Sequence, residues 1–123
     1  MRIDFDADRA ISAGVTSRRE ARPWLPLLNA VLGLAGSHAQ LLSHGERAWA
    51  SITFAGSRHT IALTFAGEDG AAAAEAFIAA LPEHEFSIRG RLVADATVVS
   101  VDHALLPAPS VTVQAEFLLL DDG

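Results

Sequence analysis

The segment that most constrains the fold is Ala48–Ala66, in which apolar and polar side chains alternate on either side of a glycine–serine pair. Taking Gly56-Ser57 as a two-residue hairpin turn places Phe54 opposite His59. Strand side chains alternate between two faces, so this register gathers eight residues on one face. They are Ala48, Ala50, Ile52, Phe54, His59, Ile61, Leu63 and Phe65. A slip of one residue would mix the two faces, so the pattern predicts an antiparallel hairpin with one buried face.

The length and composition predict one packed domain, residues 1–123. A chain of this size buries roughly two-thirds of the surface that it exposes when unfolded. Hydrophobic residues make up 50% of the sequence and charged residues 20%, which favours a packed globule over disorder. The mean hydropathy of +0.29 is high for a soluble monomer and predicts that a second copy or a ligand covers part of the apolar surface.

Charge and residue usage exclude several classes of function. The net charge of −6 argues against a nucleic acid partner, because phosphate neutralisation needs a basic surface. The absence of cysteine excludes disulfides, thiolate metal sites and cysteine nucleophiles. The absence of lysine excludes Schiff-base and P-loop lysine chemistry. The abundance of arginine and alanine is typical of a high-GC bacterial genome.

No targeting or membrane-spanning segment is expected. The most apolar run, Trp24–Ala35, is far shorter than the roughly 20 residues that span a bilayer. The first residues alternate acidic and apolar side chains and lack the apolar region of a signal peptide. The expected location is therefore the cytoplasm, with no membrane partner.

Two helices are predicted from apolar residues at helical spacing. The first runs from Arg22 or Pro23 to about Leu34 and is apolar nearly all round, so we expect it to be clamped between layers or to lie in an oligomer interface. The second runs over 70–81, with Asp69 as its N-cap and a proline after its end.

The rest of the chain predicts strands joined by short turns. The predicted strands are 3–5, 38–44, the two arms of the 48–66 hairpin, 86–103 and 111–119. A turn at Gly45-Glu46 would join the second of these to the hairpin in a three-stranded meander. The stretch 86–103 is too long for one straight strand, so it must break at Gly90 or bulge at Val98–Val99.

Together these elements predict an α+β fold with a single, mainly antiparallel sheet of five to six strands. Both helices would pack on one face of the sheet, in a ferredoxin-like or plait-like two-layer sandwich. The other face would be left open.

No pattern points to catalysis, a cofactor or a metal. Asp4, Asp6 and Asp8 alternate on a strand, but the residues that follow lack the glycine and glutamate of a calcium loop, so we expect a solvated acidic edge. The histidines do not have zinc-motif spacing, and His59 is expected to be a partly buried core histidine. No nucleophile motif or phosphate-binding glycine loop is present. We therefore predict no catalytic, cofactor-binding or metal-binding residue.

The predicted interaction surface is the sheet face opposite the helices. Trp49 and Leu42 would form its apolar centre, since an exposed tryptophan among small polar residues is typical of a binding hot spot. The polar residues around them are His38, His44, Arg47, Thr53, Thr60 and Thr64. This face is interpreted as a solvated sheet, a sheet-to-sheet dimer contact or a ligand surface.

These features favour a non-catalytic binding or assembly module that forms a homodimer through the Trp49 face. An unidentified small molecule or protein is a further expected partner. The alternative is a small cofactor-free enzyme of the isomerase or lyase type, with a histidine or aspartate site in an intersubunit cleft. A third hypothesis is a structural subunit of a larger bacterial or phage assembly.

Overall fold

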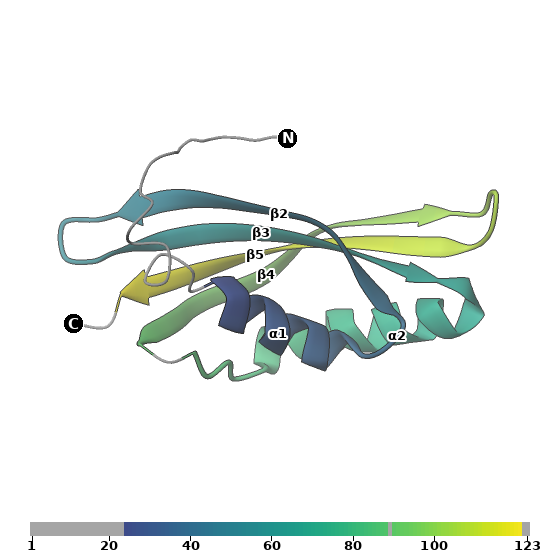
Figure 1. Cartoon of the computed structure of the whole chain (residues 1–123), viewed down its shortest axis with the longest axis horizontal. Coiled ribbons are helices and arrows are strands. Elements are labelled where there is room, and N and C mark those ends of the chain that lie inside the picture. Colours follow the sequence, from purple (N-terminus) through teal and green to yellow (C-terminus); the bar gives the residue numbers. More distant parts are fainter. Residues whose placement is uncertain (1–23, 89, 122–123) are drawn as a thin grey trace.

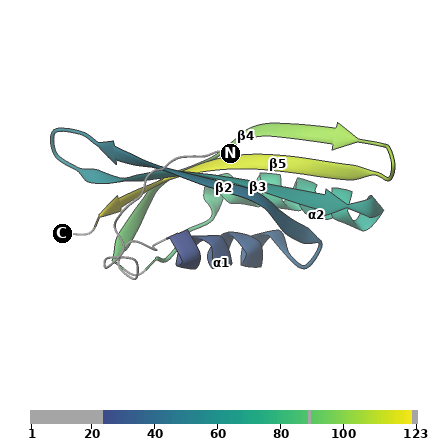
Figure 2. The ribbon, with the colours of Figure 1, turned by 45° about the horizontal axis from the view of Figure 1, so that its top comes forward.

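The computed structural model describes residues 24–88 and 90–121 of the chain. Its elements are α1 (Trp24–Ala35), β2 (Ala39–Ala50), β3 (Ala55–Ala66), α2 (Gly67–Ala80), the short 3-10 helix η3 (Leu81–Glu83), β4 (Arg91–Ala104) and β5 (Ser110–Asp121). In the described ranges, the strands form one antiparallel sheet in the order β2-β3-β5-β4. Both helices pack against the same face of this sheet (Figures 1 and 2).

The core lies between the helices and the two central strands, β3 and β5. Alternate side chains of these strands point towards the helices and are buried, as the alternation in the sequence predicts for the second arm of the hairpin. They are His59, Ile61, Leu63, Phe65, Val111, Val113, Ala115, Phe117 and Leu119. The helices contribute Leu27, Val31 and Phe77, all at most 2% exposed. Burying each large apolar side chain contributes about 1.5–3 kcal/mol.

The α+β class is confirmed, but the predicted sheet of five to six strands, and with it the ferredoxin-like strand plan, is wrong. The described residues form four strands. The predicted strand 38–44 and the first part of the predicted strand 48–54 both belong to β2, which ends at Ala50, because Gly45 and Glu46 pair with β3 instead of forming a turn. The predicted strand at 3–5 and the acidic residues next to it lie outside the described residues.

The centre of the hairpin turn lies four residues before its predicted position. Residues 51–54 connect β2 to β3, and Ala50 pairs with Ala55. The hydroxyl oxygen of Ser51 accepts hydrogen bonds from the backbone N–H groups of Thr53 (3.3 Å) and Phe54 (3.0 Å), and the Ser51 N–H donates to the Phe54 carbonyl at 2.7 Å. Such side-chain bonding stabilises a turn without glycine. Ile52 and Phe54, predicted to be buried, are therefore exposed at the tip.

Gly56 lies inside β3, where strand packing requires a glycine. A Cβ at this position would overlap the carbonyl oxygen of Leu119 on the neighbouring strand β5. The missing side chain therefore allows two backbones to approach closely, which is a second role of glycine besides turn formation.

The helices lie close to their predicted positions. The first ends at Ala35, one residue after the predicted end. The second begins at Gly67 with Ala66 as its N-cap, so Asp69 is in the first turn and the prediction that it caps the helix is wrong. An acidic side chain in the first turn still stabilises the helix, because it interacts favourably with the positive end of the helix dipole.

The extended stretch 86–103 breaks at one predicted position and bulges at the other. Gly90 has a φ of 76° and immediately precedes β4. The pairing of β4 with β5 shifts between Val93 and Asp95 and again between Val98 and Ser100. These two β-bulges change which face the following side chains occupy.

The two layers of the fold differ in length. The strands have 12 or 14 residues, which corresponds to about 40–46 Å at roughly 3.3 Å per residue. The helices also have 12 or 14 residues but extend only about 18–21 Å. The β2–β3 hairpin consequently projects beyond α1 (Figure 1). Neither helix is long and apolar enough to cross a membrane.

Candidate functional site

Exposed large apolar side chains are concentrated on the two hairpins of the sheet. Of the ten such residues in the described part of the chain, only Leu25 lies on a helix. The first hairpin, β2–β3, carries Leu41, Leu42, Ile52 and Phe54. The second hairpin, β4–β5, carries Leu92, Val99, Val101, Leu105 and Leu106. All nine lie in edge strands or turns and none in the paired segments of β3 and β5, so the apolar surface follows the rim of the sheet.

The most exposed of these residues form the two hairpin tips. Ile52 is fully exposed and Phe54 is 52% exposed at the β2–β3 tip. Leu105 and Leu106 are 78% and 85% exposed at the β4–β5 tip. The tips lie at opposite ends of the sheet (Figures 1 and 2). The molecule therefore presents apolar side chains in two opposite directions.

The edge strands carry different charges on the face away from the helices. On β2, Arg47 lies opposite Arg58 of β3, and the Arg58 guanidinium is 3.7 Å from the Glu116 carboxylate. On β4, Asp95 and Asp102 pair with Leu118 and Thr112, which also lie on this face. A shallow hollow of about 270 Å³ lies beside the arginines, lined by Gly45, Glu46, Arg47, Arg58, Thr60 and Glu116. On this face the β2 edge therefore carries an arginine, Arg47, and the β4 edge carries two aspartates, Asp95 and Asp102.

The predicted interaction residues are only partly brought together. Trp49, Arg47, Thr60 and Thr64 share the helix-free face, and Trp49 lies opposite Gly56. Leu42 is the bulged residue of β2, between Leu41 and Ser43, and is 60% exposed. His38 and Thr53 lie outside the strands, in the turns before and after β2. Because β2 continues through Gly45 and Glu46 without the predicted turn, alternation alone places His44 on the helix face, opposite to Trp49.

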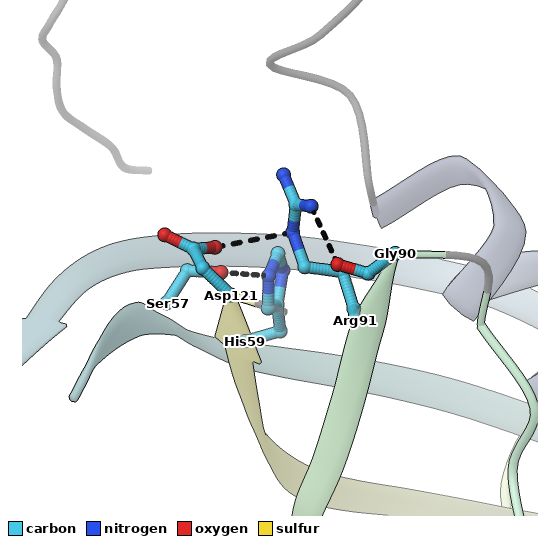
Figure 3. Close-up of polar contacts among 5 residues, drawn as sticks. All are labelled: Ser57, His59, Gly90, Arg91 and Asp121. Carbon is cyan, nitrogen blue, oxygen red and sulfur yellow. Dashed lines mark hydrogen bonds and ion pairs between the residues drawn. The ribbon is translucent and has the colours of Figure 1, made fainter. Parts of the chain in front are cut away.

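His44 belongs instead to a polar cluster at the end of the core. Its Nε2 lies 3.0 Å from Nδ1 of His59. Nε2 of His59 lies 2.8 Å from the Ser57 hydroxyl, and Figure 3 shows this second contact. Trp24 of α1 stacks on His44, with 4.8 Å between ring centroids. His59 is completely buried, so these bonds satisfy both of its ring nitrogens. The prediction of a core histidine is correct for His59, but its partner His44 was assigned to the wrong face.

The cluster has the bonding order of a nucleophile, a base and an orienting group, but its electrostatics suit a structural role. Burial, with a smaller contribution from His44, lowers the pKa of His59 to about 3, and burial also lowers the pKa of His44. A general base works best with a pKa near the working pH. The hollow beside Arg47 lies on the opposite face of the sheet from Ser57. We therefore interpret the cluster as the polar boundary of the core, where the helical layer ends.

A second polar contact lies at the same end of the sheet. The Arg91 guanidinium is 3.2 Å from the Asp121 carboxylate and also donates to the Gly90 carbonyl at 2.9 Å (Figure 3). Arg91 and Asp121 are opposite each other in the β4–β5 pairing. Among the described residues, no group of three or more histidine, aspartate or glutamate side chains is arranged to hold a metal ion.

Comparisons with known proteins support the fold. No protein-family model and no curated protein matches the chain. The chain is similar to one chain of a solved structure described as "Virion of native gene transfer agent (GTA) particle". The TM-score is 0.52 at 16% identity, over 91% of this chain and 100% of that chain. At this identity the similarity concerns the fold alone, and it extends over the full length of the virion chain.

Proposed function

We propose that this chain is a structural subunit that assembles with other protein chains into a multi-protein particle. The observation that carries the proposal is the concentration of exposed large apolar side chains on the two hairpins. Exposed apolar groups that cluster in this way mark surfaces that a partner covers. The similarity in fold to a chain of a virion particle supports the same role.

The arrangement of these side chains favours association at more than one place. The two apolar tips project from opposite ends of the sheet, so one partner cannot cover both in the same way. Two different contact surfaces on one subunit allow rings or filaments, whereas one self-complementary surface stops at a dimer. The helix-free face around Trp49 remains part of the proposal, because Arg47, Thr60 and Thr64 lie on it with Trp49.

The proposal is tested by light scattering of the purified full chain over a dilution series, with Ile52→Ser/Phe54→Ser as the variant. Burying one large apolar side chain contributes about 1.5–3 kcal/mol, so the variant should need about tenfold or more protein for half-association. Leu25→Ser, which alters the exposed apolar residue of α1, is the matched control and should leave association unchanged.

The measured mass separates the hypotheses. A mass of two chains at all concentrations supports the homodimer that the sequence predicts, and a larger mass supports a higher assembly. A wild-type chain that stays monomeric up to high concentration contradicts self-assembly as its function.

A further inference from the structure

We propose that copies of this chain join head to tail, with strand β4 of one copy pairing antiparallel with strand β2 of the next. The proposal rests on the assembly role above and names the partner, a second copy of this chain, and the contact. In the described ranges β2 and β4 are the two outer strands of the sheet. Outer strands of 12 and 14 residues present long rows of backbone donors and acceptors that can pair with another chain.

Strand direction permits this pairing. Every neighbouring pair in the sheet is antiparallel, so β2 and β5 run in one direction and β3 and β4 in the other. A second copy in the same orientation therefore places its β2 antiparallel to β4 of the first. The helices of both copies then lie on the same side of one continuous sheet.

The bulges of the two outer strands match in one register. With Arg47 opposite Asp95 of the neighbouring copy, Leu41 falls opposite Val101. Arg47 follows Leu41 by six residues, and Val101 follows Asp95 by six. Each interval contains one bulge, at Leu42 on β2 and at Val99 on β4. Without a bulge, residues six apart on a strand would share a face, and one bulge between them puts them on opposite faces. Arg47 and Asp95 therefore both lie on the helix-free face, and Leu41 and Val101 both lie on the helix face.

The two contacts in this register are complementary. Leu41 and Val101 are 42% and 37% exposed on the helix face, so their contact would remove apolar surface from water. On the other face, Arg47 lies opposite Arg58 within its own sheet, and like charges in that position are unfavourable. A carboxylate supplied by Asp95 of the neighbour would offset this repulsion.

Charge also favours unlike edges over like edges. Pairing β4 with a second β4 in a register centred one residue beyond its middle places Asp95 opposite Asp102, so that acidic residues face each other twice. Pairing β2 with a second β2 about its middle places Arg47 opposite Leu42 and supplies no carboxylate. The β4–β2 contact matches opposite charges, which selects orientation and partner.

The test is a charge-reversal cycle in the full chain, read by light scattering over a dilution series. Arg47→Asp and Asp95→Arg should each raise the concentration for half-association about tenfold or more, because each places like charges together. The double variant Arg47→Asp/Asp95→Arg should recover association to within about threefold of wild type. The matched control Arg47→Asp/Asp102→Arg should not recover it, because Asp102 faces Gln40 in this register.

A second measurement does not depend on any variant. Hydrogen exchange of wild type at high and low concentration should show slower exchange in β2 and β4 on association, with no change in β3. Unchanged exchange in the outer strands would overturn the proposal, as would equal behaviour of all the charge variants. If the chain still associates while either of these two outcomes is observed, the assembly role stands and the proposed edge contact is wrong. A monomeric wild type overturns both the edge contact and self-assembly.

Discussion

In the polar cluster at the end of the core, the position of the ring proton of His59 sets the direction of its hydrogen bonds to His44 and Ser57. The neutral ring of His59 has one N–H, so one of its nitrogens donates and the other accepts. If Nε2 donates to Ser57, Nδ1 accepts from His44; if Nδ1 donates to His44, Nε2 accepts from the Ser57 hydroxyl. Both arrangements use the neutral His59 ring, which burial favours by lowering the pKa of His59.

The buried His59 should make the stability of the fold depend on pH. Its pKa is lowered from 6.5 to about 3, so between these values the unfolded chain binds more protons than the folded chain. The contribution is complete above about pH 6.5 and is lost as the pH falls towards 3, at a limiting rate of about 1.4 kcal/mol per pH unit. Urea unfolding of wild type and His59→Gln at several pH values between about 7 and 4 measures this. The variant should lose less stability over that range.

Two comparisons isolate this effect. His38→Gln changes an exposed histidine and should keep the wild-type slope. Burial raises the pKa of Glu46, which lies opposite His59 on β2, and its pH trend has the opposite sign. Because Glu46 is present in both proteins, the difference between their slopes reports on His59. Equal slopes would contradict the assignment of His59 as a neutral buried ring.

At the scale of the elements, two glycines in neighbouring strands should respond oppositely to the same substitution. Gly56→Ala places a Cβ against the Leu119 carbonyl and 2.9 Å from the Leu120 Cα, so it forces the β3 and β5 backbones apart. We expect a loss of about 1–3 kcal/mol in the free energy of unfolding. Gly45→Ala meets nothing within 4 Å and should stabilise β2 by about 0.5–1 kcal/mol. Chemical denaturation of both variants measures the contrast; a Gly56→Ala protein as stable as wild type would show that the strands separate at little cost.

These glycines also show how much of the fold the sequence predicts. The helical spacing of apolar residues located both helices, and the alternation of Ile61, Leu63 and Phe65 identified the buried face of β3. Both patterns are visible in the sequence because burial of one face imposes a period of about 3.6 residues on a helix and of two residues on a strand. The turns were misplaced because glycine has several roles: Gly45 lies within a strand and Gly56 allows a close backbone approach. The turn that forms depends on a hydroxyl of Ser51 bonding to nearby backbone, which composition alone does not reveal.

The candidate surface was less predictable than the fold. Trp49 and three of its predicted neighbours share a face, as alternation implies. His44 was assigned to this face through the predicted turn at Gly45-Glu46; because β2 continues through these two residues, His44 lies on the other face, in the core cluster. The bulge at Leu42 changes the face only of the β2 residues before it. A bulge leaves little trace in a sequence, since it adds one residue without a characteristic side chain. The apolar tips were missed because Ile52 and Phe54 were assigned to a strand.

At the scale of the whole molecule, net charge and the local edge contact act in opposite directions. Each copy carries a net charge of −6, so copies repel one another at distances up to the screening length. That length falls from about 30 Å at 0.01 M salt to about 8 Å at 0.15 M, whereas a contact ion pair is screened much less. Association of wild type should therefore strengthen over this range of salt. Sedimentation or light scattering at the two ionic strengths measures it, and weaker association in moderate salt would mean that ion pairs dominate assembly.

The unequal length of the two layers has a mechanical consequence. Helices and a packed core back part of the sheet, and a slab of two layers resists bending. Among the described residues, no helix lies behind the part of the β2–β3 ribbon that extends beyond α1, so we expect that part to bend with less force. Each subunit thus combines a stiff body with a compliant arm. Curvature imposed on a row of such subunits would be taken up in the arms, and the shape of each body would be preserved.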